Sequence, residues 1–217
     1  MPDIGALLSP NAVAIIGAAP DEEMLRGRIL YVMKQHPFAG AIYPVSRSHD
    51  EVQGLKAYPS IEDLPERVDL AIMIIPAQFV PDELERCGKA GVKAVQILTS
   101  GFAEEIGDDG AKAQQQLREI AERYDMAVVG PNSEGFASTK VALCPTFSPT
   151  FNNQTRPRVP EWRKNGHIAA VAQSGGIGFA FYDRGRPKEL PFSYVVTTGN
   201  EAAINGFDVI EHIIDRN

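Results

Sequence analysis

A doubly wound α/β fold is predicted by three features of the 217-residue sequence. Short apolar runs rich in Val and Ile recur along the chain, and each run is apolar on both of its faces. Segments with apolar residues at helical spacing separate these runs, and Gly or Pro marks several of their ends. Strands buried on both faces read as continuous apolar runs, so this alternation indicates a parallel sheet with helices on both sides.

The first part of the chain is predicted to hold five strands, at residues 13–16, 41–45, 70–75, 94–98 and 127–129. Helices are predicted between them, at residues 24–35, 81–90 and 109–124. The second of these helices has Pro81 at its start and Gly91 directly after it, which is the usual asymmetry of helix ends. The second and third strands are expected to be joined mostly by loop, with one short turn at residues 60–64.

The pattern changes after residue 143. Residues 145–165 contain four prolines and no apolar periodicity, so they predict an interdomain linker or an ordered crossover. Strands are then predicted at 167–171 and 193–196, with one helix after Ser174 and another at 205–215. Two parallel strands cannot bury their own faces, so the second domain is expected to continue beyond Asn217 or to be completed by a partner. The predicted domains are residues 1–143, a linker at 144–165, and residues 166–217.

Composition excludes several classes of function. The net charge is -7 and the pI about 5.2, with no run rich in Lys or Arg, which argues against nucleic-acid binding. No signal-peptide pattern and no apolar run of membrane-spanning length is present, so a cytoplasmic protein without membrane contact is expected. Cys87 and Cys144 stand outside any metal-binding motif, and we expect two free thiols and no metal site.

Two loops at strand ends suggest a phosphate-bearing ligand. The loop after the first strand, Gly17-Ala18-Ala19, has only the first glycine of a dinucleotide fingerprint and is also compatible with a plain tight turn. After the second strand, where NAD-binding proteins usually place an acidic residue, the chain has Ser46-Arg47. An arginine there suits a ribose phosphate, which both NADP and CoA carry, although a solvated surface arginine would look the same.

Seven short strings follow predicted strand ends in a fixed order: Ile16-Gly17-Ala18, Tyr43-Pro44-Val45, Ile75-Pro76-Ala77, Thr99-Ser100-Gly101-Phe102-Ala103-Glu104, Gly130-Pro131-Asn132, Gln173-Ser174-Gly175-Gly176 and Gly199-Asn200-Glu201. In this order, across about residues 8–217, they resemble the NDP-forming acyl-CoA synthetases. That family includes the ADP-forming acetyl-CoA synthetases and the α subunit of succinyl-CoA synthetase. The resemblance implies a Rossmann-like CoA-binding domain followed by the beginning of a flavodoxin-like ligase domain.

The resemblance also implies roles for particular residues. The turn at Gly17, Ala18 and Ala19 would face the CoA phosphates, and Ser46 and Arg47 would lie near the ribose 3′-phosphate. The nucleotide and pantetheine path would be lined by Pro76, Ala77, Ser100, Gly101 and Phe102, with Asn132 near the thiol end. The turn Ser174-Gly175-Gly176 opens a helix, and in the family such a helix start receives a phosphohistidine.

The sequence departs from the family at two of these places. The family has Ser where this chain has Ala19, which removes one side-chain donor to phosphate. The family commonly has Asn-Pro where this chain has Ser46-Arg47, which could bind phosphate by another route.

The resemblance implies an acid–thiol ligase that converts a carboxylic acid, CoA and ATP to acyl-CoA, ADP and phosphate through a phosphohistidine. None of the histidines here matches that position: His36 and His49 are expected in exposed loops, and His167 and His212 are expected to be structural. The chain alone is therefore expected to be inactive. ATP and Mg²⁺ would bind an ATP-grasp domain or subunit outside this chain, and the full-length enzyme is expected to be oligomeric.

Two other functions fit parts of the sequence. Related CoA-binding domains are fused to protein acetyltransferases, where they act as regulatory sensors, and Ala19 favours that alternative mildly. An NADP-binding reductase domain would share Arg47 but would leave the motifs of the second domain without explanation.

Overall fold

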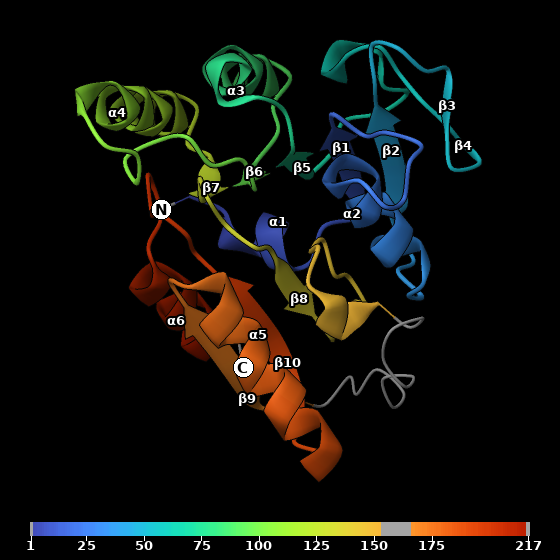
Figure 1. The fold of residues 1–217 in the computed structure, drawn as a ribbon, viewed down its shortest axis with the longest axis vertical. Coiled ribbons are helices and arrows are strands. Elements are labelled where there is room, and N and C mark those ends of the chain that lie inside the picture. Colours follow the sequence, from blue (N-terminus) through green and yellow to red (C-terminus); the bar gives the residue numbers. More distant parts are fainter. Residues whose placement is uncertain (1, 153–165, 216–217) are drawn as a thin grey trace.

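The computed structural model describes residues 2–152 and 166–215, and its first part is a five-stranded parallel sheet (Figure 1). The sheet has the strand order β2-β1-β5-β6-β7 and confirms all five predicted strands. Their bounds are β1 (Ala12–Ile16), β2 (Ala41–Val45), β5 (Leu70–Met73), β6 (Ala94–Ile97) and β7 (Ala127–Val129).

Alternate residues of these strands enter two separate apolar cores. In β1, Val13 and Ile15 pack with α1 (Ile4–Leu8) and α2 (Leu25–Lys34). Ala14 and Ile16 point to the other face, which α3 (Val80–Lys89) and α4 (Asp108–Arg123) cover. Figure 1 shows these two helix layers on opposite sides of the sheet, which is the doubly wound arrangement that the apolar strands predict.

The segment between β2 and β5 contains a small hairpin that the sequence does not predict. Its strands, β3 (Glu51–Val52) and β4 (Leu55–Lys56), hold two residues each. The turn between them, Gln53-Gly54, has positive φ at both positions, as a tight hairpin turn requires. The predicted short turn at residues 60–64 is present as a 3₁₀ turn, η1 (Ile61–Asp63).

The second part is a three-stranded sheet of order β8-β10-β9. The predicted strands appear as β9 (Ile168–Ala172) and β10 (Phe192–Thr197), and the predicted helices as α5 (Gly175–Gly185) and α6 (Gly206–Asp215). The unpredicted strand β8 (Phe136–Ser138) pairs antiparallel with β10. Val196 of β10 and Val209 of α6 share the core of β1, α1 and α2, so the two sheets are packed together through one apolar layer.

The described part of the predicted linker is an ordered crossover. Cys144, Thr146 and Phe151 are fully buried there. The Phe151 ring stacks on Tyr182 of α5, with 4.7 Å between ring centroids. Residues 153–165 of the predicted linker lie outside the described residues, and the domain boundaries at 143 and 166 stay a prediction.

The expectation of an exposed His36 is wrong. Only 8% of this residue is exposed, because the crossover covers the end of α2. Its Nε2 lies 2.8 Å from the Phe151 carbonyl oxygen, and burial lowers the pKa of the imidazole. His49 is exposed, and Cys87 and Cys144 are free, buried thiols, as predicted. Among the described helices, none has both the length and the apolar character needed to span a membrane.

Candidate functional site

A cavity of about 390 Å³ lies beyond the carboxyl ends of β1, β2 and β5. The chain direction across the sheet reverses between β1 and β5, so this is the topological switch point at which open α/β sheets bind ligands. Four residues predicted for the site line the cavity: Gly17, Ser46, Arg47 and Pro76. The structure therefore brings together loops that are separated by about 30 residues in the sequence.

The turn after β1 requires a glycine at position 17. Gly17 has φ +93°, and a Cβ atom there would lie 2.5 Å from the Ile74 carbonyl oxygen. The Gly17 N–H donates to the Val45 carbonyl at 3.0 Å, which ties the turn to the end of β2. Ala18 is buried beneath the turn, and Ala19 is half-buried. Of the three predicted residues of this turn, Gly17 lines the cavity, whereas Ala18 and Ala19 do not.

The loop after β2 is fixed by a histidine. The imidazole Nδ1 of His49 is 3.1 Å from the hydroxyl of Ser46 and 2.9 Å from that of Ser48. Ser46 is buried by this arrangement, whereas Arg47 between the two serines is exposed. The loop therefore presents the guanidinium of Arg47 at the mouth of the cavity.

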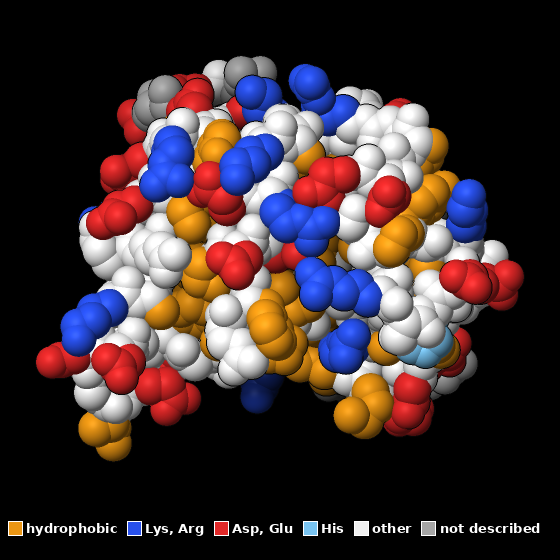
Figure 2. Space-filling view, turned by 90° about the horizontal axis from the view of Figure 1, so that it is seen from above, with side chains coloured by type: hydrophobic (Ala, Val, Ile, Leu, Met, Phe, Trp, Pro, Cys, Tyr) orange, Lys and Arg blue, Asp and Glu red, His pale blue; other side chains and the backbone are white. Residues whose placement is uncertain are grey.

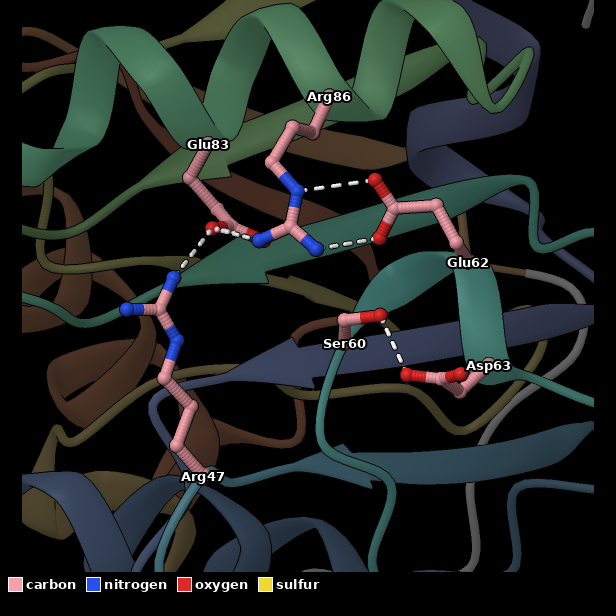
Figure 3. Close-up of polar contacts among 6 residues, drawn as sticks. All are labelled: Arg47, Ser60, Glu62, Asp63, Glu83 and Arg86. Carbon is pink, nitrogen blue, oxygen red and sulfur yellow. Dashed lines mark hydrogen bonds and ion pairs between the residues drawn. The ribbon is translucent and has the colours of Figure 1, made fainter.

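Glu83 and Arg86 line the cavity from α3, and they contact Arg47 of the loop after β2 and Glu62 of η1 (Ile61–Asp63) (Figure 3). We call Arg47, Glu62, Glu83 and Arg86 the Arg86 cluster. Arg86 donates from Nε and Nη2 to the two carboxylate oxygens of Glu62, and from Nη1 to Glu83 at 2.9 Å. Glu62 belongs to η1, whose start is stabilised by a 2.6 Å hydrogen bond from Ser60 to Asp63. Arg86 is therefore held rigidly by two carboxylates.

The Arg86 cluster gives a pH dependence that can be measured. The hydrogen bonds from Arg86 lower the pKa of Glu62 to about 2, from an ordinary value near 4.5. A lowered folded-state pKa stabilises the fold above pH 4.5, and this contribution is lost as the pH falls toward 2. Because half of the Glu62 side chain is exposed, we expect about 1 kcal/mol. Glu62→Gln should lower stability by that amount at pH 7 and by roughly a quarter of it at pH 2.5, where the folded-state carboxylate is still partly ionised; urea unfolding measures both, and an equal loss at both pH values would contradict the prediction.

Arg26 is a site residue that the sequence does not reveal. It is the second residue of α2, and its Nε donates to the Gly17 carbonyl oxygen at 2.8 Å. It lines the cavity, and in residues 2–152 and 166–215 no carboxylate forms an ion pair with it. A guanidinium without a carboxylate beside the glycine turn is a donor suited to phosphate.

Glu83, Arg86 and Phe79 were also missed. All three line the cavity from α3 or from the 3₁₀ turn η2 (Ala77–Phe79) before it. The only signal in the sequence was position, since the helix after β5 begins at the same sheet edge as the glycine turn. Figure 2 shows Lys and Arg side chains interspersed with Asp, Glu and hydrophobic side chains across this face.

A second cavity, of about 570 Å³, lies where the two sheets meet. It gathers the remaining predicted motifs, and its lining includes Ser100, Asn132, Ser174, Gly175 and Asn200. Gly176 lies beside open space: a Cβ there would have no neighbour within 4 Å among the described residues.

Asn200 joins the motifs around this cavity. Its side-chain amide donates to Glu104 and to Gln114, and its Oδ1 accepts from Asn132 at 3.3 Å. Glu104 in turn accepts from the backbone N–H groups of Gly101 and Phe102. Desolvation acts to raise the pKa of Glu104, but these donors outweigh it and hold the pKa below its usual value. The loop after β6 is thereby fixed to the loop after β10.

Glu134 places a carboxyl group beside the start of α5. A Cβ on Gly175 would lie 2.4 Å from Glu134 Oε2, so only glycine fits next to it. Burial raises the pKa of Glu134, and a hydrogen bond from Ser148 offsets part of that effect.

The predicted site residues thus lie in two groups, one around each cavity, and a contact between Ala77 and Gly101 joins the two groups. A Cβ on Gly101 would lie 3.2 Å from the Ala77 Cβ, so the ends of β5 and β6 touch between the two cavities. Phe102 differs from expectation, because its side chain is fully buried among apolar residues behind α4 and cannot line a ligand path.

Comparisons with known proteins agree with this architecture. The CoA binding domain family matches residues 11–139, and the succinyl-CoA ligase like flavodoxin domain family matches residues 165–217. The chain therefore belongs to the CoA-binding domain family, and in this chain the CoA-binding domain is followed by a succinyl-CoA ligase-like flavodoxin domain.

Its relatives are ADP-forming ligases. The chain is 35% identical, over 95% of its length, to the α subunit of acetate–CoA ligase [ADP-forming] II of Pyrococcus furiosus. It is 38% identical, over 94% of its length, to a 4-hydroxybutyrate–CoA ligase [ADP-forming] of Nitrosopumilus maritimus. It spans 42% of the first protein and 28% of the second. A solved acetyl-coenzyme A synthetase 1 of Ca. Korarchaeum cryptofilum superposes on 97% of this chain with a TM-score of 0.85 and 31% identity, and this chain covers 43% of it.

Proposed function

We propose that this chain binds CoA in the cavity at the carboxyl ends of β1, β2 and β5. The observation that carries the proposal is the position of Gly17, Arg26 and Arg47 around one cavity at the switch point of a CoA-binding-domain fold. CoA presents a pyrophosphate, a ribose 3′-phosphate and an adenine, and the cavity offers donors for each charged group. The exposed ring of Phe79 adds a surface on which the adenine can stack.

The guanidinium groups of Arg26 and Arg47 would bind different phosphates of CoA. Arg26 lies at the glycine turn and would bind the pyrophosphate through its guanidinium, because the N–H groups of Gly17 and Ala19 already donate to the carbonyl oxygens of Val45 and Arg26. It would replace the side-chain donor that the family has at position 19, where this chain has alanine. Arg47, on the next loop, would bind the 3′-phosphate with Ser46 and Ser48 beside it.

The pantetheine arm would run from the first cavity to the second. Pro76 lines the first cavity and Ser100 the second, and the contact of Ala77 with Gly101 lies between them. The thiol would then arrive near Asn132, which Asn200 and the Thr99 carbonyl hold in position. This path uses Phe102 only through its backbone.

The turn Ser174-Gly175-Gly176 would receive a phosphorylated histidine. The α5 helix presents its positive end to the second cavity, and glycines there leave room for a phosphate. Among the described residues no histidine lines that cavity, so the histidine would come from outside this chain.

In the whole protein the reaction would be formation of acyl-CoA from a carboxylic acid, CoA and ATP, with release of ADP and phosphate. The ATP and Mg²⁺ would bind another domain or subunit. A solved structure of the Korarchaeum enzyme, which contains phosphate and ADP, superposes on 98% of this chain and supports the proposal.

A pair of substitutions tests the assignment of the two arginines. Arg47→Ala should weaken CoA binding about tenfold and leave dephospho-CoA binding unchanged, because only the 3′-phosphate loses a charge-assisted contact. Arg26→Ala should weaken the binding of both CoA and dephospho-CoA about tenfold, because both ligands contain the pyrophosphate. Calorimetric titration measures all four affinities.

Arg28→Ala is the matched control. Arg28 lies on the same helix but pairs with Glu23 and does not line the cavity, so both affinities should stay within about twofold. An equal loss of affinity for CoA and dephospho-CoA in Arg47→Ala would refute the assignment of Arg47 to the 3′-phosphate. Unchanged affinities in both Arg47→Ala and Arg26→Ala would refute the proposal that CoA binds in this cavity.

A further inference from the structure

Glu83 is a buried carboxylate in the wall of a cavity proposed to hold phosphate. Its side chain is only 7% exposed, and its Oε2 lies 2.9 Å from Arg86 Nη1 and 3.6 Å from Arg47 Nη2 (Figure 3). Phosphate sites ordinarily exclude carboxylates, because two negative charges in one cavity repel each other. A carboxylate in this position therefore needs an explanation beyond that of a surface ion pair.

The two arginine partners of Glu83 are held very differently. Arg86 is fixed by a bidentate contact to Glu62 in addition to its hydrogen bond with Glu83. Arg47 is 77% exposed at its side chain and lies beyond hydrogen-bond distance from Glu83. Arg47 can therefore leave Glu83 without leaving that carboxylate without a partner, since Arg86 still donates a hydrogen bond to it.

We propose that Glu83 is a specificity-determining residue, which occupies Arg47 until a ribose phosphate displaces it. The inference rests on the proposed CoA function and adds an internal competitor to that site. A phosphate monoester carries a charge of about −2 and three acceptor oxygens, whereas Glu83 offers Arg47 only Oε2, which already accepts a hydrogen bond from Arg86. The ribose phosphate therefore displaces Glu83 as the partner of Arg47, whereas a ligand without that phosphate leaves the Arg47–Glu83 ion pair intact.

The opposite role, in which Glu83 positions Arg47 for the phosphate, predicts a different structure. A positioning carboxylate would hold the guanidinium by hydrogen bonds and keep it partly buried, as Glu62 does for Arg86. The long distance between Arg47 and Glu83 and the high exposure of Arg47 instead favour a role in which Glu83 competes with the ribose phosphate for Arg47. The two roles give opposite signs when the Glu83 charge is removed, so one substitution separates them.

The test is Glu83→Gln, which keeps the size of the side chain and its capacity to accept a hydrogen bond from Arg86. Calorimetric titration with CoA and dephospho-CoA should show about fivefold tighter CoA binding, the size of one partly exposed charge pair. Dephospho-CoA binding should stay within about twofold, and it also reports that the fold and cavity are intact. In Arg47→Ala/Glu83→Gln the gain for CoA should disappear.

Two further variants keep the test decisive. Glu85→Gln removes a carboxylate from the same helix outside the cavity, where it pairs with Arg123 and Lys89, and should change neither affinity. If the buried glutamine prevents folding, Glu83→Asp withdraws the charge from Arg47 by one methylene and should give a smaller gain of the same sign.

The outcomes separate this inference from the proposed function. If the unchanged chain prefers CoA to dephospho-CoA through Arg47, but Glu83→Gln lowers that preference or leaves it unaltered, only the role of Glu83 is overturned. If the unchanged chain binds neither ligand, the proposed function falls and the role of Glu83 with it.

Discussion

Replacing Phe151 with alanine is expected to lower the free energy of unfolding by about 3–5 kcal/mol, the cost of removing a buried aromatic ring. Phe151 is fully buried, stacks on Tyr182 and meets Phe179 edge-on at 5.9 Å between centroids. Its carbonyl oxygen also lies against His36 of the segment after α2. The ring thus joins the crossover, α5 and the first part of the chain in one core. Urea unfolding followed by circular dichroism measures the loss.

Phe181→Ala is the control for this prediction. Phe181 lies in the same α5 helix but is 62% exposed, so its removal should change stability by about 0.5 kcal/mol or less. A loss below about 1 kcal/mol in Phe151→Ala would mean that the crossover is not part of the folded core, contrary to its burial in the structure.

Replacing Gly17 with alanine is expected to weaken CoA binding at least about tenfold, because the turn must move and Arg26, which donates to the Gly17 carbonyl oxygen, must move with it. The added Cβ meets the Ile74 carbonyl oxygen at 2.5 Å, and φ at this position is +93°. Alanine therefore forces the turn after β1 away from β5 and adds backbone strain of about 1–3 kcal/mol. Calorimetric titration with CoA gives the affinity, and urea unfolding gives the stability.

Gly54→Ala is the control that separates the effect of backbone strain on stability from the effect of a displaced turn on CoA binding. Gly54 has φ +82° in the β3–β4 turn, and a Cβ there would have no neighbour within 4 Å in the described part of the chain. This variant should lose stability through strain while its affinity for CoA stays unchanged. CoA binding by Gly17→Ala as tight as that of the unchanged chain would show that the turn does not form the phosphate site.

The sequence predicted the main sheet well because each of its strands is apolar on both faces. It did not predict β3 or β4, since strands of two residues leave too short a pattern to detect. It also did not predict β8, which pairs with β10, a strand more than 50 residues away in the sequence. The exposed His36 was mispredicted because the crossover that covers it comes from more than 100 residues away.

The candidate site was predictable where a cavity-lining residue lies in a motif at a strand end, as at Gly17 and Arg47. It was not predictable where a role depends on the direction of a side chain on a helix. Arg26, Glu83 and Arg86 are ordinary charged residues in the sequence, and only the packing of α2 and α3 turns them toward the cavity. Phe102 shows the reverse case, since its motif is at the site while its ring is in the core.

The central claim is that the cavity at the switch point of the first sheet binds CoA through its phosphates. Calorimetric titration of the chain with CoA, dephospho-CoA and NADPH tests it most directly. We expect saturable binding of CoA, weaker binding of dephospho-CoA and no comparable binding of NADPH. No heat of binding with CoA at millimolar concentration, or tighter binding of NADPH, would contradict it.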